Sequence, residues 1–363
     1  MKTFLRQLTI SAVGLAALAQ AQPATPGYDD ITRPVELIPM AQNKRNRVSV
    51  NYTMGLNITA DFKKLGGFTG SNPGPATGGA VDRTYDNAYN RVDITGNDHG
   101  PGFQNTTWNW GYRNAGSVQG NQMVFTSSSS LANVASKNNA DDPQHGLEIA
   151  YARELFEKGR WRFGVEGGLG FMRLSIGDTR TLTATINQVT DSFAIPTGVV
   201  VPPAPYNGTF AGPGAVIGSE PSSRTTGVSS TTATITGSRL LDADVYSLRI
   251  GPYAEVELSR KFSLMFNGGL YLAAGDSRFS YQETVSLPGV GTEFHSGAGS
   301  QTDFLIGGYV GGNVEYAVTK DIALFAGARF QSAGRPVNQE TGKEAILNLN
   351  QSVIVSIGAT YSF

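Results

Sequence analysis

Residues 353–363, at the end of the chain, read VIVSIGATYSF. Every odd position carries an apolar side chain, and the even positions are mostly small or polar: Ser356, Gly358, Thr360 and Ser362. Strict alternation predicts a β-strand with one apolar and one polar face. The stretch also matches the roughly 9–11 residues that a tilted strand needs to cross a bilayer. It is therefore either a membrane-spanning strand or an edge strand of a soluble sheet, and the other segments have to decide.

The chain ends on an aromatic residue, Phe363, with a second one, Tyr361, two positions earlier. This ending resembles the terminal strand of bacterial outer-membrane β-barrels, in which the assembly machinery reads the final Phe. The resemblance implies that the barrel-assembly machinery is a partner of this chain through its C-terminal strand.

The amino terminus has the pattern of a secretory signal. Lys2 and Arg6 precede an apolar run over residues 8–19, and Ala19-Gln20-Ala21 forms a small-x-small cleavage site. We therefore expect residues 1–21 to be a signal peptide for export by the Sec pathway, with an amphipathic first helix as the alternative. Residues 22–47 contain four prolines and no clear periodicity, which predicts an irregular periplasmic leader.

Composition favours β-structure and excludes several kinds of chemistry. Glycine is abundant at 45 residues and only 16% of residues are charged. Cysteine is absent, so the chain has no disulfide, thiolate metal site or thiol nucleophile. The 28 basic residues nearly balance the 29 acidic ones, which gives no support to a nucleic-acid partner. No apolar run after residue 19 is long enough for a membrane helix.

The alternation seen at the end of the chain recurs along it. Residues 48–62 place Val48, Val50, Tyr52 and five further apolar side chains on one face without a break. In all, the pattern predicts eight strands, at residues 48–62, 146–156, 161–171, 246–258, 262–272, 304–318, 322–330 and 353–363. Short turns alternate with long loops, at about 63–145, 178–240, 286–299 and 331–346. This asymmetry is typical of an antiparallel up-and-down transmembrane β-barrel over residues 48–363, with periplasmic turns and extracellular loops.

One aromatic segment in the first loop leaves the strand number open. Residues 107–112 include Trp108, Trp110 and Tyr112, and a second short apolar segment follows at 122–125. We expect an extracellular hairpin, while an extra transmembrane pair would give ten strands instead of eight. The three aromatic side chains could form a stacking platform for surface sugars, although local packing within the hairpin is the simpler interpretation.

The inward faces of the predicted strands collect charged residues of both signs. Unpaired charges in a narrow lumen are costly, so we expect a network formed by Arg162, Arg249 and Arg329 with Glu166, Glu255 and Glu315. A selectivity ring or an acid–base pair is the alternative. Aromatic residues near the strand ends predict a girdle at the headgroup level: Trp161, Phe262, Tyr316, Tyr361 and Phe363.

The three histidines, His99, His145 and His295, fall in or beside predicted extracellular segments. Their spacing matches no catalytic motif, and no two of them share a strand face. We therefore predict no catalytic residue, no metal site and no cofactor.

In architecture the chain is similar to the small outer-membrane barrels of the OmpA-transmembrane-domain and OmpX kind. The resemblance covers the strands and the C-terminal ending, and the loops are far longer here. It implies the cell outer membrane as the location, with outer-membrane lipids and lipopolysaccharide as partners. It does not identify the ligand of the loops. We predict a non-enzymatic structural, adhesive or surface-recognition barrel with a lumen closed by ion pairs. The alternatives are a narrow small-solute channel, a lipid- or peptide-modifying enzyme at the extracellular rim, and a soluble lipocalin-like barrel.

Overall fold

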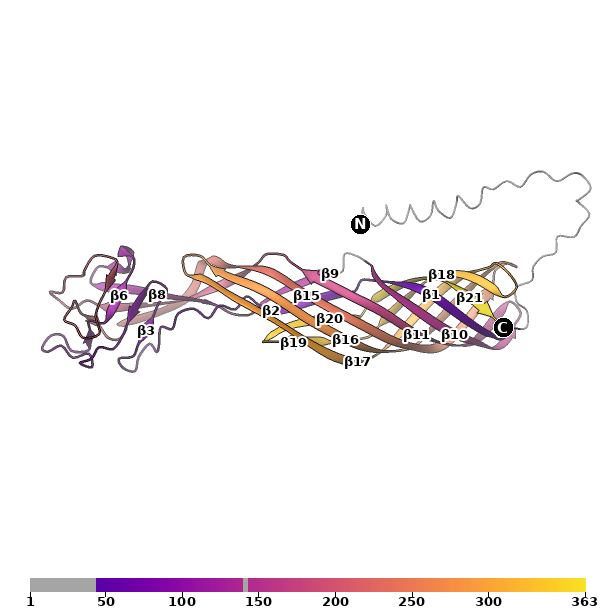
Figure 1. Ribbon diagram of the computed structural model, residues 1–363, viewed down its shortest axis with the longest axis horizontal. Coiled ribbons are helices and arrows are strands. Elements are labelled where there is room, and N and C mark those ends of the chain that lie inside the picture. The colour runs from indigo at the N-terminus through magenta and orange to yellow at the C-terminus, as the bar shows by residue number, and fades with distance from the viewer. Residues whose placement is uncertain (1–43, 140–142) are drawn as a thin grey trace, which may run out of the picture. The chain divides into compact units, whose positions relative to one another are not determined.

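The computed structural model describes residues 44–139 and 143–363 (Figure 1). The predicted signal peptide and most of the predicted leader lie outside the described residues. Within the described part of the chain, no helix is long and apolar enough to cross a membrane.

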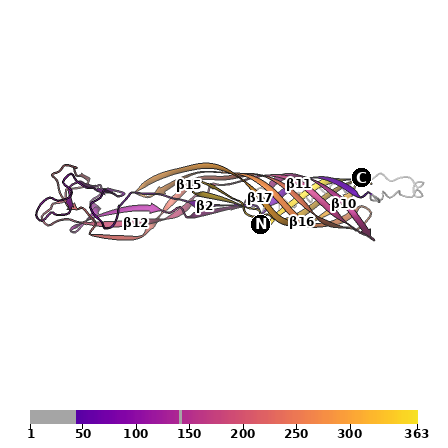
Figure 2. The ribbon, with the colours of Figure 1, turned by 90° about the horizontal axis from the view of Figure 1, so that it is seen from below.

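Eight antiparallel strands form a closed ring, which confirms the predicted fold class and excludes ten strands. They are β1 (Asn46–Leu56), β10 (Gln144–Lys158), β11 (Trp161–Asp178), β15 (Ser223–Glu257), β16 (Phe262–Leu287), β17 (Gly291–Ala317), β18 (Ile322–Ser332) and β21 (Ser352–Ser362). The ring runs β11-β10-β1-β21-β18-β17-β16-β15, and the pairing of β15 with β11 closes it. Figure 2 shows the oblique strands of this barrel around β10, β11, β16 and β17.

The short turns and the chain end lie at one end of the barrel. Lys158 pairs with Trp161 across a turn in which Gly159 has a φ of 65°, a conformation that glycine adopts without steric cost. At the same end, Asn46 and Phe363 exchange two backbone hydrogen bonds of 3.2 and 2.9 Å. In barrels of this kind the short turns are periplasmic, so the opposite end is extracellular.

The outside of the barrel is apolar. On β15, Tyr246 and Ile250 point outward with exposed fractions of 56% and 54%, whereas Arg249 between them is 6% exposed. The predicted girdle residues all lie on this outer surface near the short-turn end. Their contact with lipid headgroups stays a prediction.

Most of the expected extracellular loops are strands, which corrects the sequence analysis. The segment expected as a loop at 286–299 belongs to a hairpin in which β16 and β17 pair up to Leu287 and Gly291. The segment at 178–240 contains β12 (Leu182–Ala194), β13 (Tyr206–Asn207), β14 (Ile217–Gly218) and the start of β15. These strands were missed because their apolar side chains face inward and their polar ones outward, the reverse of the membrane pattern.

A second sheet completes the part beyond the membrane. It has the order β19-β20-β2-β9, from β19 (Val337–Glu340), β20 (Lys343–Asn348), β2 (Thr59–Leu65) and β9 (Val134–Asn139). The predicted strand at 48–62 is therefore two strands, separated at Asn57, whose φ is 59° and whose side chain donates to the Gln351 carbonyl at 2.8 Å. We call this sheet, together with the extracellular parts of four barrel strands, the extension. These parts are β11 after residue 172, β15 before residue 245, β16 after residue 275 and β17 before residue 303.

Short strands form a further structure around the aromatic segment. They are β3 (Arg83–Thr84), β4 (Ala88–Asn90), β5 (Thr106–Thr107), β6 (Trp110–Tyr112), β7 (Val118–Gln119) and β8 (Gln122–Ser130), with a 3-10 turn at Ala115–Ser117. The order β13-β6-β4-β3 makes one small sheet, whereas β8 pairs with β12 and β7. Segments 107–112 and 122–125 thus do not pair with each other, contrary to the predicted hairpin.

Candidate functional site

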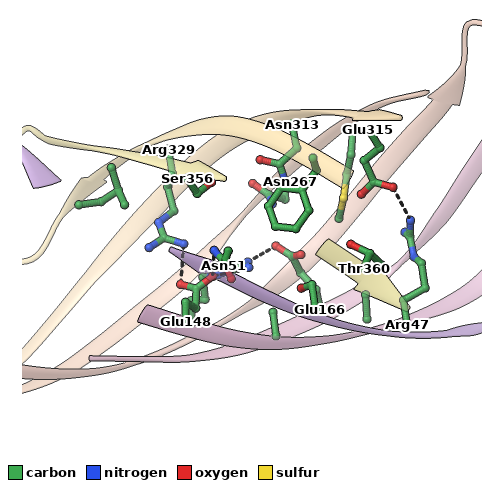
Figure 3. A pocket seen from close by; sticks show the side chains of 17 residues that line it. Arg47, Asn51, Glu148, Glu166, Asn267, Asn313, Glu315, Arg329, Ser356 and Thr360 are labelled. Carbon is green, nitrogen blue, oxygen red and sulfur yellow. Dashed lines mark hydrogen bonds and ion pairs between the residues drawn. The ribbon is translucent and has the colours of Figure 1, made fainter. Parts of the chain in front are cut away.

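The lumen contains a first cluster of ion pairs in which Arg249 is central. Figure 3 shows its other charged members, Glu148, Glu166 and Arg329. The Nε of Arg249 donates to Glu148 Oε1 at 3.0 Å, and its Nη1 donates to Glu166. Arg329 Nη1 from β18 donates to the other oxygen of Glu148 at 2.9 Å. Tyr309 also donates to Glu166, at 3.4 Å. Two arginines and two glutamates therefore neutralise one another across the barrel.

A second cluster lies closer to the short turns. Arg47 Nη1 is 2.8 Å from Glu255 Oε2 and 3.5 Å from Glu315 Oε2. Arg162 Nη2 is 2.7 Å from the other oxygen of Glu255, whose side chain is fully buried. The buried charges are paired and hydrogen-bonded, the condition under which charges persist away from water.

The structure places all six predicted lumen residues inside the barrel and in these two clusters. Arg249 pairs with Glu166 and Arg162 pairs with Glu255, both within the predicted set. Arg329 pairs with Glu148 and Glu315 pairs with Arg47, so the network also includes two residues that were not predicted. Arg47 was assigned to the leader, although it is the residue directly before the predicted first strand. Inward position could be read from alternation, but the choice of partner depends on strand register.

Between the clusters lies a cavity of about 40 Å³, room for very few water molecules. Its lining includes the amides of Asn51, Asn267 and Asn313. Eight-stranded barrels have an interior just wide enough for side chains to fill, and the small volume agrees with this.

Beyond the first cluster the interior is filled by an apolar core. Ile58, Phe62, Leu174 and Phe279 are each at most 1% exposed and belong to one buried cluster with Tyr271. This cluster joins strands of the barrel to strands of the second sheet. The same core therefore fills the interior beyond the first cluster and holds the extension together.

A groove of about 700 Å³ opens on the extension. One wall comes from Phe294, His295 and Ser296 of β17, and the opposite wall from residues 67–69 and 129–132. Tyr281 and Lys343 also line it. Lys343 is nearly buried and donates to Glu283, so its charge is already neutralised. No motif in the sequence analysis pointed to this groove, because it depends on how distant segments meet.

Each of the three histidines has a local partner. The ring of His99 stacks on Trp108 with centroids 3.8 Å apart, and its Nε2 is 2.8 Å from Asp93 Oδ2. His145 bonds to the Tyr52 hydroxyl, and His295 Nε2 lies 2.9 Å from the Gly67 carbonyl. Across the described ranges, no group of three or more metal-ligating side chains is found.

The Asp93 carboxylate organises the loop that carries His99. Burial alone would raise its pKa, but hydrogen bonds from the Asn97 backbone and from Thr95 outweigh it and lower the pKa of Asp93. The carboxylate is thus held charged as the acceptor of a tight turn.

Burial favours the local packing of the aromatic residues over the stacking platform, which was the other interpretation of the sequence. Trp110 is fully buried and Tyr112 is 3% exposed, both in a core with Tyr85, Phe125 and Phe193. Trp108 is half-buried against His99. The aromatic residues hold the distal strands together, so they do not form a common open surface.

A closed antiparallel ring with an apolar outside and a charged, filled inside is a transmembrane β-barrel of the outer-membrane type. No protein-family model and no curated protein matches this chain.

Several solved structures are similar at low identity. The outer-membrane protease OmpT of Escherichia coli matches with 9% identity and a TM-score of 0.35, covering 90% of this chain and 99% of that chain. Ail, the attachment invasion locus protein of Yersinia pestis, matches with 9% identity and a TM-score of 0.27, covering 89% and 100%. Neisserial surface protein A matches with 13% identity and a TM-score of 0.22, covering 88% and 97%. The eight-stranded ring itself is established by the strand pairing.

Proposed function

We propose that this chain is a non-enzymatic outer-membrane barrel with a closed lumen, and that it holds the extension outside the cell as a surface for recognition or adhesion. The observation that carries the proposal is the double closure of the interior, by the ion-pair clusters and then by the apolar core of the extension. A solute pathway would have to break both layers, whereas a recognition protein needs only a rigid support.

The surroundings of the protein follow from the same proposal. The apolar outer surface contacts outer-membrane lipids and lipopolysaccharide, and β21 with Phe363 is read by the assembly machinery. We assign no catalytic role to the histidines, because each ring is engaged in a local contact. A hydrolytic activity that is lost in His145→Ala or His295→Ala would contradict this assignment.

The channel is the competing function, and conductance separates the two. We expect planar bilayers containing the refolded protein to be silent. Arg249→Ala should remain silent as well, because the apolar core beyond the first cluster is untouched by that substitution. Resistance to unfolding by detergent in gel electrophoresis serves as the control that the barrel is folded. Steady conductance that changes with Arg249→Ala would overturn the proposal and favour a channel filtered by the lumen charges.

A further inference from the structure

The extracellular part of β17 has one unpaired edge. β17 pairs with β16 all the way from Tyr316 to Gly291, but with β18 only as far as Gly308. Within the part of the chain that the structure describes, no strand pairs with the other side of residues 291–307. Such an edge is a template for an additional strand.

The register identifies which backbone groups are free. The Ala317 N–H donates to the Lys261 carbonyl on the β16 side, and the Val318 N–H donates to Ile322 on the other side. The register of β17 with β16 continues without a bulge to Gly291. The backbone N–H and C=O groups of successive residues point to opposite sides of a strand. The even residues therefore present N–H and C=O at the open edge: Thr292, Phe294, Ser296, Ala298, Ser300 and Thr302.

The 700 Å³ groove lies along this edge. It is lined by Phe294, His295 and Ser296, three consecutive residues whose side chains alternate between the two faces of the strand. The groove therefore borders this stretch of the edge strand. Residues 67–69 form the opposite wall, so a strand placed in the groove would meet backbone on one side and side chains on the other.

Contacts across the inner face hold the groove open. The Thr69 N–H donates to Glu293 Oε1 at 3.0 Å, and His295 bonds to the Gly67 carbonyl. Within this wall, Phe68 and Ser130 exchange two backbone hydrogen bonds of 3.0 Å. The groove is therefore formed before any partner arrives, which lowers the entropic cost of binding.

The edge lacks the strongest protections against pairing. Natural edge strands carry lysine, proline, bulges or inward-pointing charges, whereas residues 291–307 contain neither lysine nor proline and carry only the two carboxylates of Glu293 and Asp303. The segment at 296–300 is Ser-Gly-Ala-Gly-Ser, which is small on both faces. β19 covers the inner face near Gly299, where the Asn338 amide reaches the carbonyl at 3.5 Å, without pairing with the strand.

The charge beside the edge is negative. Glu293, Asp303 and Glu340 lie along it, and Glu340 Oε2 would be 2.4 Å from a Cβ added at Gly299. None of the three carboxylates has a lysine or arginine within ion-pair distance among residues 44–139 and 143–363. A strand that carries basic side chains complements this edge.

We propose that the open edge of β17 binds an extended, basic peptide segment of another protein, which adds a strand to the sheet and places side chains in the groove. This inference rests on the proposed recognition function and names its partner class. Main-chain hydrogen bonds supply the affinity, and the groove and its carboxylates supply the specificity.

A second copy of this chain does not fit the edge. Copies in the same membrane are related by rotation about its normal, so their β17 strands run in the same direction. Barrel strands tilt by about 35–45°, and the tilts oppose each other across the rotation axis. The two edges would cross instead of running side by side.

The test uses a fluorescent peptide of about ten residues that alternates lysine and valine, added to the refolded full chain in detergent. We expect saturable binding in fluorescence anisotropy and slower hydrogen exchange of the even residues from 292 to 302. A peptide of the same sequence with alternate amides N-methylated should bind at least about tenfold more weakly, because it loses about 1.4 kcal/mol or more of main-chain bonding.

Two variants separate edge pairing from general attraction. Ala298→Pro removes an N–H that faces the open edge, a position at which proline is tolerated, and should weaken binding about tenfold. Ala298→Val keeps the N–H and should bind as the wild type does. Glu340→Gln should weaken binding about threefold at low salt, and Glu157→Gln on the periplasmic turn should change nothing.

Each outcome decides one question. Equal binding of the N-methylated peptide, or by Ala298→Pro, would overturn strand addition and leave only charge attraction. If Ala298→Pro fails to fold, the N-methylated peptide decides alone. Binding of neutral oligosaccharide in place of peptide, or self-association in sedimentation, would also overturn the proposal. A silent bilayer without peptide binding removes the docking site alone, whereas steady conductance removes the closed lumen alone.

Discussion

The two halves of β16 have the same backbone pairing and opposite side-chain chemistry. In the membrane half, Phe266 and Leu270 point outward with exposed fractions of 48% and 45%, and Asn267 points inward. In the extension, Asp276 and Arg278 point outward and Phe279 is fully buried inside. The pairing with β17 passes through both halves without a register shift, so the faces themselves never exchange. Only the surroundings of the outer face change, from lipid to water.

On four adjacent strands this change falls between two aligned rows of residues. Phe171, Tyr246, Ala274 and Phe304 are aligned neighbours on adjacent strands, and the next aligned outward row is Arg173, Asp244, Asp276 and Thr302. Arg173 and Asp244 pair at 2.9 Å on this row. The first row is apolar and the second is charged or polar, so on these four strands the apolar outer surface ends between them.

The largest expected difference between the halves concerns two phenylalanines of β16. Phe279→Ala leaves a cavity in the apolar core and should destabilise the extension by about 3–5 kcal/mol. Phe266→Ala should cost far less, because lipid chains fill the space that the ring leaves. Limited proteolysis of the extension and urea unfolding in lipid vesicles measure the two effects. Equal losses would show that the halves are packed by the same forces.

A charge introduced on the outer face of β15 should give the second-largest difference in stability between the membrane half and the extension. Ile250→Arg places a guanidinium in the membrane and should destabilise the barrel by about 2 kcal/mol or more. Leu240→Arg lies on the same face in the extension and should have almost no effect, because water solvates the charge. Folding yield into vesicles and unfolding by urea provide the comparison. A costly Leu240→Arg would move the membrane boundary outward.

Acid should destabilise the extension through protonation of Asp178. We expect this loss of stability to be smaller than the effects of the substitutions in β16 and β15. Burial acts to raise its pKa, but hydrogen bonds from Arg180 and Ser136 outweigh it and lower the pKa of Asp178. A lowered pKa means that Asp178 stabilises the fold fully above the ordinary carboxyl range, and that this contribution is lost as the pH falls through the lowered value.

The matched variant for this prediction is Asp178→Asn. It should be less stable than the wild type at about pH 7 and should show a weaker loss of stability toward about pH 2. Hydrogen exchange of β9 and β15 across that range measures the difference. An identical pH profile for both proteins would contradict the assignment.

Prediction from sequence succeeded where one side of a strand faces lipid. Alternation located all eight membrane strands and the inward position of residues such as Arg249 and Glu166. It failed beyond the membrane, where the strand predicted at 161–171 continues to Asp178 with Leu174 and Ile176 turned inward. The period of two is unchanged there, but the apolar side chains now point inward and the polar ones outward, because the outer face meets water instead of lipid.

The candidate sites divide in the same way. The lumen charges could be predicted because a narrow interior forces opposite charges to pair. Arg47 and Glu148 could be assigned to the clusters only once the strand register was known. The groove at β17 could not be predicted, since its walls come from segments more than two hundred positions apart in the chain, such as Gly67 and His295. Trp110 and Tyr112 pack locally, as the simpler interpretation of the sequence had it, but their core includes Phe193 of β12, a segment that was expected to be a loop.

The sequence by itself determined the barrel and located its eight spanning strands, because lipid outside and a narrow lumen inside impose a strict period of two on each of them. The pairing of the strands decided between eight and ten. The tertiary structure alone decided which charges pair, where the membrane ends and where an edge stays open. These properties depend on which strands become neighbours, and the free energy of pairing is shared among segments that are distant in the chain.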